Sequence, residues 1–330
     1  MHREPHTAWS RSAAEPVGVL GATSFVGQSV LARLQVAGLQ VAGRRDTDPP
    51  AADRQVFAFS RSPAAVAGAN ASAGVSWYRL PAGPELPTEP LPPVPIPQWI
   101  AVSPLWTVSA QLPLLAAAGA QRLVAISSTS RLTKRNSAAA EERALAARLA
   151  AAEEEVLDRA RAEGIVATIL RPTMIYDGSH DRNVMTIAGF IRRYGFFPVA
   201  GAAAGLRQPV HADDVASAAV AALARDGLCS TYELSGGETL PYRDMLRRIF
   251  AWLGQPLRLV TVPLPLVQAA VPVVGLLPGL GRLPAMAARM NEDLVFDHGA
   301  ATRDIGFQPR AFTLPLQGDS NHAAGRLLHR

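Results

Sequence analysis

The sequence predicts an α/β protein with a doubly wound parallel sheet and a smaller C-terminal region. Apolar runs of strand length alternate with helix-length segments as far as about residue 176. The runs are continuously apolar, which is typical of parallel strands buried on both faces. A glycine-rich turn joins the first run to the first helix, and after Asp177 the alternation loosens.

Length and composition indicate a globular chain. At roughly 150 residues per domain, 330 residues suggest about two domains. The hydrophobic share of 48% and the charged share of 18% exclude wholesale disorder. The single cysteine, Cys229, excludes an internal disulfide framework and a cysteine-rich zinc site, and it fits a reducing, cytoplasmic location. The arginines are scattered and Lys134 is the only lysine, so we expect no nucleic-acid binding.

The predicted elements of the first half follow one another closely. A short strand ends at Leu20, and a helix from Val26 to about Val36 places its apolar residues on one face. The polar segment 44–54 carries two prolines and is a loop. Further strands are predicted at 55–59 and 75–80, and eight prolines in 81–97 indicate a rigid surface connection.

The alternation continues after the proline-rich connection. Buried strands are predicted at 99–102 and 123–126, on either side of an apolar helix around 108–118. A long helix rich in alanine, glutamate and arginine covers 138–161, and a sixth strand covers 165–170. These segments complete a sheet covered by helices on both faces.

Two kinds of segment fall outside this pattern. Residues 1–15 and 319–330 are predicted to be tails, and the first lacks the apolar core of a signal peptide. The stretch Leu259–Gly281 is uncharged and long enough for a bilayer, but four prolines interrupt it. We expect it to form a buried wall or an oligomer contact, with peripheral membrane contact as the alternative.

The glycine-rich turn lies where the first strand meets the first helix. Glycine allows close approach of a diphosphate, and a helix N-terminus offers unpaired N–H groups and partial positive charge. Serine replaces the middle glycine of the G-x-x-G-x-x-G pattern, and it is small enough to be tolerated. A purely structural turn is the alternative. The residues predicted to hold the diphosphate are Gly21, Ala22, Thr23, Ser24, Phe25, Val26 and Gly27.

The end of the second strand bears on the choice of dinucleotide. An NAD site normally has a carboxylate there for the ribose 2′-hydroxyl, but this chain has Ser60, Arg61 and Ser62. A guanidinium beside hydroxyls suits a 2′-phosphate. The sequence therefore favours NADP, with NAD as the alternative if Arg61 is only solvated.

Three further motifs support a family resemblance. Ile126-Ser-Ser-Thr129 closes a strand, Leu170-Arg-Pro-Thr-Met-Ile-Tyr176 closes the next, and Arg207-Gln-Pro-Val-His-Ala-Asp-Asp-Val215 opens a helix. In this order the chain resembles the extended or atypical short-chain dehydrogenase/reductase superfamily, the NAD(P)-dependent epimerase/dehydratase kind. The resemblance covers roughly residues 16–310, including Tyr232–Gly237 and Tyr242.

The resemblance implies a domain division and further cofactor contacts. A Rossmann-type NAD(P)-binding domain would cover 16–176 and be completed by about 206–228, with a substrate-binding region at 177–205 and 229–318. Thr129 would orient the substrate oxygen as a catalytic hydroxyl. The further cofactor-binding residues that the resemblance implies are Ser103, Pro104, Ser127, Ser128, Arg171, Pro172 and Thr173.

The usual catalytic pair of the family is missing. Its tyrosine phenol transfers the proton, and a lysine four residues later lowers the pKa of that phenol. The residue four before Lys134 is Ser130, so no Tyr-x-x-x-Lys exists in the chain. When Glu153 is aligned with the glutamate that follows the pair in the family, Leu145 occupies the position of the tyrosine and Leu149 that of the lysine.

Other groups near the sixth strand are candidates for proton transfer. Tyr176 is the main one, and His180 follows it at i+4, although Asp177-Gly178 between them favours a loop. The alternative is that Tyr176 is a pocket wall and His180 a loop residue. Asp177, Asp181 and Lys134 are weaker candidates. His211, Asp213 and Asp214 are expected to cap a helix, and we expect no metal site.

Two functions follow from these observations. The first is an NADP-preferring oxidoreductase or nucleotide-sugar epimerase/dehydratase-like enzyme acting on a small molecule. The arginines and aromatic residues within 189–207 would receive an anionic substrate such as a sugar nucleotide, unless they only form an amphipathic helix. The second is a non-catalytic NADPH-binding scaffold or redox sensor, similar to the short-chain-dehydrogenase-like accessory subunit of respiratory complex I.

Overall fold

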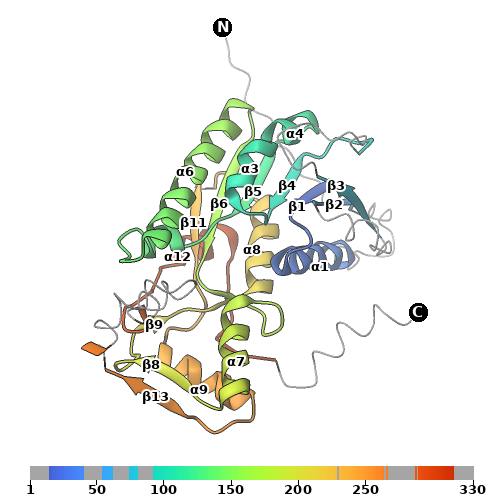
Figure 1. Ribbon diagram of the computed structural model, residues 1–330. Coiled ribbons are helices and arrows are strands. Elements are labelled where there is room, and N and C mark those ends of the chain that lie inside the picture. Colours follow the sequence, from blue (N-terminus) through green and yellow to red (C-terminus); the bar gives the residue numbers. More distant parts are fainter. Residues whose placement is uncertain are drawn as a thin grey trace.

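The computed structural model describes residues 15–40, 54–61, 74–80, 92–228, 230–263, 265–266, 287 and 289–315. Its centre is a seven-stranded parallel sheet in the order β11-β6-β5-β4-β1-β2-β3 (Figure 1). The strands are β1 (Val17–Leu20), β2 (Val56–Ser60), β3 (Val75–Arg79), β4 (Gln98–Ala101), β5 (Arg122–Ile126), β6 (Val166–Pro172) and β11 (Thr231–Leu234).

The strand order reverses at β1. From β1 the chain moves outward through β2 to β3, then returns to β4 on the other side of β1 and continues outward to β11. A crevice forms at such a switch point because the connections leave the carboxyl ends of the two central strands in opposite directions. This strand order confirms the predicted doubly wound sheet, and the crevice expected at the switch point is at the carboxyl ends of β1 and β4.

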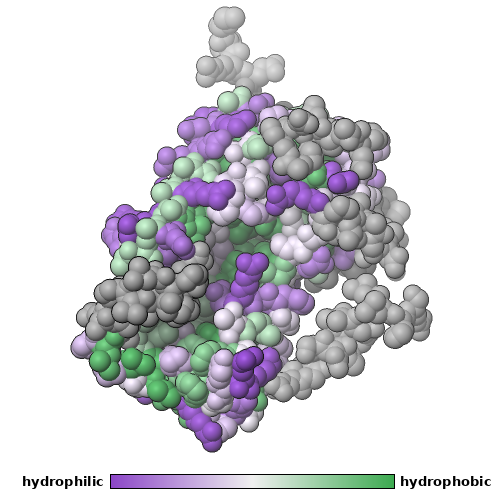
Figure 2. All heavy atoms as spheres, in the orientation of Figure 1, coloured by the Kyte–Doolittle hydropathy of each residue, from purple (hydrophilic) through white to green (hydrophobic). Residues whose placement is uncertain are grey.

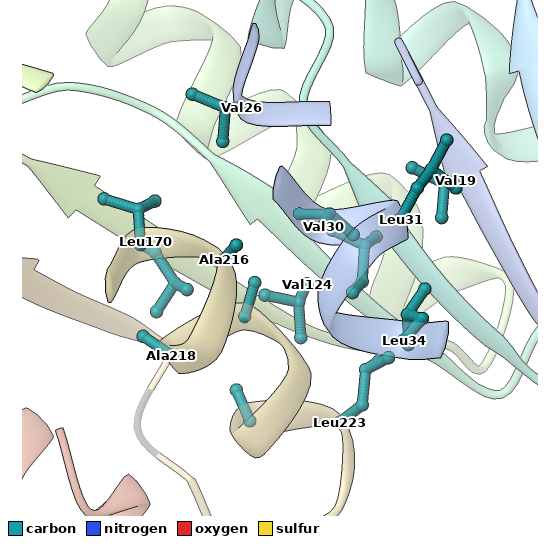
Figure 3. Close-up of a cluster of buried hydrophobic side chains, with 14 of the residues drawn as sticks. Val19, Val26, Val30, Leu31, Leu34, Val124, Leu170, Ala216, Ala218 and Leu223 are labelled. Atoms are coloured by element: carbon teal, nitrogen blue, oxygen red, sulfur yellow. The ribbon is translucent and has the colours of Figure 1, made fainter. Parts of the chain in front are cut away.

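One face of the sheet is covered by α1 (Phe25–Gln40) and α8 (Ala212–Leu223). The strands alternate, so Val19 of β1 and Val124 of β5 point toward these helices. Figure 3 shows Leu34 of α1 beside Leu223 of α8, and Val30 of α1 near Val124 of β5. The many alanines of α8 allow the two helices to approach closely.

The other face is covered by three short helices and one long one. These are α3 (Leu105–Val108), η2 (Ser109–Gln111), α4 (Leu112–Ala117) and α6 (Ala140–Ala162). The indole of Trp99 fills the space beside Gly18, where an added Cβ would lie 2.4 Å from the ring. A side chain at residue 18 would therefore displace the largest fully buried residue of this core.

Two late elements join the sheet. Strand β11 pairs with β6, and α12 (Gly299–Ile305) packs against β11 and α8. The sequence-based division places both in the substrate-binding region. In Thr231–Leu234 half-buried and buried positions alternate, so this strand lacks a continuous apolar run.

The remaining elements form a third hydrophobic cluster below the sheet in Figure 1. Helices α7 (Arg182–Tyr194) and α9 (Tyr242–Trp252) contribute Ile191 and Phe250 to it. Three small sheets connect this part: β7 (Ile175–Tyr176) with β10 (Val210–His211), β9 (Leu206–Arg207) with β12 (Leu240–Pro241), and β8 (Phe197–Ala200) with β13 (Leu259–Val262).

Several predicted features lie outside the described residues. These are residues 1–14 of the first tail, the whole 319–330 tail, Cys229, Ser62, and most of the proline-rich connection. Of Leu259–Gly281, only 259–263 and 265–266 are described, and Val260 is 48% and Leu266 62% exposed. Within the described part of the chain, no helix combines the length and the apolar character needed to cross a membrane.

Candidate functional site

The glycine-rich turn links β1 to α1 at the switch point. Gly21 has φ of +77° and donates its N–H to Phe59 O of β2 at 3.1 Å. This left-handed conformation favours glycine. An added Cβ at Gly21 would also lie 2.7 Å from Ser103 N, so the turn passes directly against the chain that follows β4.

Gly27 lies one turn into α1 and packs against the start of the same loop. A Cβ there would lie 2.5 Å from Gly21 O and 2.8 Å from Ala22 C. Both outer glycines are therefore required by close backbone contact. The contact draws the first turn of α1 against the end of β1, and the helix N-terminus faces the crevice.

Ser24 caps helix α1. Its Oγ accepts the N–H of Gly27 at 3.0 Å, and its carbonyl accepts the N–H of Gln28 at 2.9 Å. The hydroxyl thus satisfies one of the free N–H groups of the first turn. The N–H groups of Phe25 and Val26 have no acceptor among the described residues. Two main-chain donors at a helix N-terminus fit the diphosphate of a dinucleotide.

The end of β2 is tied to the glycine-rich turn. Thr23 Oγ1 and Ser60 Oγ lie 3.2 Å apart, and Ser60 is buried. Arg61 follows and is exposed. A residue that the sequence-based prediction missed also lies here: Arg79, exposed at the end of β3, is in register with Ser60. Knowledge that β2 pairs with β3 would have identified Arg79, because the pairing places it beside Ser60.

Ser103 and Pro104 stand at the end of β4, on the other side of the crevice. Ser103 touches Gly21 through its backbone, and its hydroxyl lies 3.5 Å from Thr107 Oγ1. Pro104 precedes the first turn of α3, where its carbonyl accepts from Thr107 Oγ1 at 2.7 Å. The two residues therefore shape the crevice wall.

The ends of β5 and β6 are occupied by a buried ionic network around Glu153 of α6. Ser127 Oγ donates to Glu153 Oε1 at 2.6 Å, and Arg131 Nη1 donates to Oε2 at 2.9 Å. Arg171 donates to Glu153 through Nε and Nη2, the latter at 2.6 Å, and to Glu233 of β11 through Nη1 at 3.1 Å. Burial lowers the pKa of the Arg171 guanidinium, but its two carboxylate partners raise it overall.

This network uses the polar atoms of two predicted cofactor residues. The Ser127 hydroxyl and the Arg171 guanidinium are bonded to carboxylates inside the protein, and Glu153 is only 1% exposed. Both residues hold α6 against the sheet. The sequence analysis used Glu153 only to align the long helix with the family. It did not predict that Glu153 lies at the centre of an ionic network.

The other hydroxyls of this edge also have protein partners. Thr129 is 6% exposed, and its Oγ1 donates to Pro172 O at 3.2 Å. Ser128 Oγ accepts from Ser130 N at 3.1 Å at the start of α5 (Ser130–Thr133). Thr173 donates its hydroxyl to Gln208 O and its N–H to Leu234 O. Thr129 lies beside the crevice, between the carboxyl ends of β5 and β6.

Tyr176 is fully buried. Its hydroxyl lies 3.4 Å from Ala311 O and accepts from Thr313 N at 3.2 Å, and its ring meets His211 and Phe312 edge to face. Burial raises the pKa of the Tyr176 phenol. Both the hydroxyl and the ring of Tyr176 therefore contact other parts of the protein.

The loop after Tyr176 is held by its own carboxylates. Asp177 Oδ1 accepts the N–H groups of Ser179, His180 and Asp181, and Asp181 Oδ1 caps α7 through Val184 N at 2.6 Å. Burial opposes ionisation of Asp177, but these N–H donors lower its pKa overall. Asp177, His180 and Asp181 thus form a structural turn.

His211 and Asp214 organise the start of α8. His211 Nδ1 accepts the N–H of Asp213 at 3.1 Å, which requires an unprotonated Nδ1. Burial lowers the pKa of His211, and the nearby Arg310 lowers it further. Asp214 accepts from Arg310 N at 2.9 Å and from its guanidinium, so it fastens the C-terminal segment to α8.

Two buried or half-buried arginines between the sheet and the third cluster bond to other groups of the protein. Arg207 is 7% exposed, donates to the carbonyls of Leu206 and Glu292, and lies over the ring of Tyr242. Burial raises the pKa of Tyr242 to about 12. Arg289 forms an ion pair with Glu142 of α6, whose Oε1 is 3.7 Å from Lys134 Nζ. Sequence-based prediction missed this Glu142 cluster.

The segment with aromatic residues and arginines forms the end of α7 and the start of β8. Phe190 packs against Tyr194, Phe196 and Phe197, and Arg192 lies over the ring of Trp252. Figure 2 shows a hollow lined partly by apolar atoms between the sheet part above and this part below. The arrangement is an amphipathic helix whose arginines stay exposed.

Comparison with curated proteins gives two partial matches, and no family model matches the chain. The chain is 34% identical over 173 residues to NADH dehydrogenase [ubiquinone] 1 alpha subcomplex subunit 9, mitochondrial, of Arabidopsis thaliana, covering 48% of this chain and 42% of that protein. It is 27% identical over 149 residues to the uncharacterized protein y4nG of Sinorhizobium fredii, covering 45% and 37%. The chain thus matches less than half the length of either relative.

Solved structures match nearly the whole chain at low identity. The crystal structure of gox2253 aligns with a TM-score of 0.64 at 19% identity, over 90% of this chain and 94% of that one. The dTDP-glucose 4,6-dehydratase DesIV of Streptomyces venezuelae, with NAD and TYD bound, gives 0.60 at 16%, over 94% and 96%. UDP-glucuronic acid 4-epimerase of Bacillus cereus, in complex with NAD, gives 0.59 at 12%, over 90% and 92%.

The matches span both the sheet and the smaller part below it. The strand order, the glycine-rich turn and the position of Glu153 beside β5 agree with the resemblance inferred from the motifs. The chain therefore has the fold of these solved structures, which include a dTDP-glucose 4,6-dehydratase and a UDP-glucuronic acid 4-epimerase.

Proposed function

We propose that this protein binds NADP(H) in the crevice at the switch point of the sheet. The observation that carries the proposal is the turn Gly21–Gly27, which brings free N–H groups of the first turn of α1 to the crevice. Such a site neutralises a diphosphate without a lysine. Two of the structural neighbours contain NAD, which supports a dinucleotide in this position.

The choice of NADP over NAD rests on charge. The end of β2 offers no carboxylate to the ribose 2′-hydroxyl, and Arg61 and Arg79 are both exposed beside the buried Ser60. A 2′-phosphate dianion gains charge-assisted hydrogen bonds from two guanidinium groups. A bare 2′-hydroxyl gains much less, so the coenzyme with the phosphate is favoured.

For the role of the bound coenzyme, the geometry favours a non-catalytic scaffold or redox sensor. Leu149 is buried where the family lysine is expected, Tyr176 is sealed inside the protein, and Ser127 and Arg171 serve the Glu153 network. The sequence contains no Tyr-x-x-x-Lys pair. The partial match to an accessory subunit of a plant NADH dehydrogenase supports this function.

An enzyme of the oxidoreductase or nucleotide-sugar epimerase/dehydratase kind is the second candidate. Thr129 lies between the ends of β5 and β6, where a substrate oxygen would meet it, and we propose it as the catalytic hydroxyl. Neighbours named for dTDP-glucose and UDP-glucuronic acid support a sugar nucleotide as substrate. Since Arg207 and Arg289 are paired internally, an anionic substrate would depend on the exposed Arg192 and Arg193.

Three further assignments belong to this proposal. The dinucleotide domain covers 16–176 with 206–228, and we add β11 and α12 to it because they join the sheet. We propose a cytoplasmic location, while the plant relative is named as mitochondrial. The exposed Val260 and Leu266 are the described part of the contact that we propose for Leu259–Gly281 with a membrane surface or a second copy.

Fluorescence titration with NADPH and a consumption screen over carbonyl and sugar-nucleotide substrates test this function. Tight NADPH binding with no turnover supports the scaffold. Turnover that is lost in Thr129→Ala, while that variant still binds NADPH, supports the enzyme instead. If neither NADPH nor NADH binds at millimolar concentration, both candidate functions are wrong.

A further inference from the structure

A groove with a positive rim lies between α5 and the first half of α6. It has a volume of about 470 Å³ and is separate from the glycine-rich turn, because α6 and α1 cover opposite faces of the sheet. Figure 1 shows the two helices on opposite sides of the molecule. The residues that line the groove are Arg131, Leu132, Arg135, Arg143, Ala146, Ala147 and Ala150.

The floor of the groove is apolar. Arg143, Ala147 and Ala150 follow one another on one side of α6 at intervals of three or four residues. From Arg143 to Ala150 the helix rises about 10 Å, at 1.5 Å per residue. The alanines leave room above the helix, and Leu132 of α5 forms the opposite wall with 37% of its surface exposed.

Among the residues that the structure describes, two of the three guanidinium groups have no carboxylate partner. Arg131 is paired with Glu153 and Glu154. Arg143 Nη1 donates to the carbonyls of Ser137 and Ala138, which leaves its charge uncompensated. Arg135 is exposed and forms no ion pair or hydrogen bond with any residue that the structure describes. The rim therefore carries two unneutralised positive charges beside an apolar floor.

We propose that this groove binds a phosphate monoester with an apolar substituent. Two guanidinium groups suit a phosphate dianion, which accepts hydrogen bonds on three oxygens. The alanine floor and Leu132 bury the substituent. The volume falls within the range of about 300–1,000 Å³ usual for small-molecule sites, which favours a soluble ester over a macromolecular partner.

Calorimetric titration of the full chain with hexyl phosphate tests the proposal, with saturating NADPH present so that the crevice does not contribute. Hexyl phosphate binds at least about tenfold more tightly than inorganic phosphate, since its chain buries apolar surface on the floor. Arg135→Ala weakens binding about tenfold through loss of a charged donor. Ala147→Leu, at an exposed helix position, weakens it by filling the floor.

Matched controls separate the groove from general electrostatics. Arg161→Ala, on the exposed far end of the same helix, leaves binding unchanged. Thermal unfolding of each variant verifies the fold, and Arg135 has no described contact to lose. Equal affinities for hexyl phosphate and inorganic phosphate overturn the proposal, as does unchanged binding in Arg135→Ala.

A second arm identifies the source of the phosphate. Sedimentation with vesicles containing phosphatidic acid distinguishes a lipid headgroup from a soluble ester. Binding to vesicles without binding to hexyl phosphate contradicts the proposal, because the ligand is then a membrane surface. Binding to both, lost together in Arg135→Ala, supports the shared phosphate-and-apolar chemistry. The NADPH proposal is tested independently, because it rests on the Gly21–Gly27 turn at the start of α1, on the other side of the sheet.

Discussion

Ser24 Oγ accepts the main-chain N–H of Gly27 at 3.0 Å, so the residue that replaces the middle glycine of the turn is the cap of helix α1. The substitution exchanges backbone freedom for a hydrogen bond at the point where the helix begins. The Ser24 hydroxyl accepts the N–H of Gly27 and not those of Phe25 and Val26. Among the described residues these two N–H groups have no acceptor, so they can bind a ligand. The serine cap is thus compatible with a diphosphate held by the main-chain N–H groups of Phe25 and Val26.

This relationship predicts different outcomes for two substitutions at one position. Ser24→Ala removes the cap and lowers the free energy of unfolding by about 1 kcal/mol, whereas Ser24→Gly lowers it by only a few tenths. Both variants keep NADPH affinity within about threefold, because main-chain donors hold the diphosphate. Urea unfolding and fluorescence titration measure the two effects. A large loss of affinity in Ser24→Gly at unchanged stability would show that the hydroxyl contacts the phosphate.

Arg61 and Arg79 are predicted to set the choice of coenzyme. Arg61→Ala weakens NADPH binding by about 1–3 kcal/mol, the usual cost of losing a charged hydrogen-bond partner, and leaves NADH binding nearly unchanged. Arg79→Ala acts in the same direction, and the double variant binds the two coenzymes about equally. The control is Arg33→Ala on α1, whose guanidinium lies 3.9 Å from Asp213 of α8. Equal losses for NADPH and NADH would refute the 2′-phosphate assignment.

Most of the sheet could be predicted from the sequence because its strands are continuously apolar. The runs 99–101 and 123–125 are buried on both faces, and burial on both faces is what removes polar residues from a strand. Strand β11 escaped prediction for the opposite reason. At the edge of the sheet, Thr231 and Glu233 are only half buried, so the apolar run is broken.

The site was harder to predict because its polar residues are paired across long sequence separations. Ser127 and Arg171 lie at the predicted edge, but their partner Glu153 comes from the middle of a helix. Sequence motifs place a residue near a site and do not reveal which carboxylate it meets. Tyr176 shows the same limit, since Ala311 and Thr313 enclose its hydroxyl from 135 and 137 residues away.

Glu153 is predicted to be the most sensitive polar residue for stability. Glu153→Ala leaves Arg171 and Arg131 without their buried partner, and removing one member of a buried ion pair costs about 3–5 kcal/mol. Its neighbour provides the control: Glu154 is exposed, and Glu154→Ala changes stability by less than about 0.5 kcal/mol. Urea unfolding measures both variants. Similar small losses in the two would show that the network contributes little.

His211 is predicted to make stability fall in mild acid. Burial and Arg310 lower its pKa from the ordinary value of 6.5, and its Nδ1 must stay unprotonated to accept from Asp213 N. Below pH 6.5 the unfolded chain therefore binds a proton that the folded chain excludes. Stability is fully present above that pH and declines as the pH falls toward the folded pKa, by at most about 1.4 kcal/mol per unit.

The variant that isolates this effect is His211→Asn. Asparagine caps a helix as well as any residue and does not titrate, so the α8 cap persists while the pH dependence assigned to His211 disappears. The measurement is the free energy of unfolding between pH 7 and pH 5 in both proteins. The two proteins are compared by how their free energy of unfolding changes with pH. Their absolute stabilities also differ because asparagine loses the ring contact with Tyr176. Parallel slopes in the two proteins would mean that His211 titrates alike in the folded and unfolded chains, contrary to its capping role.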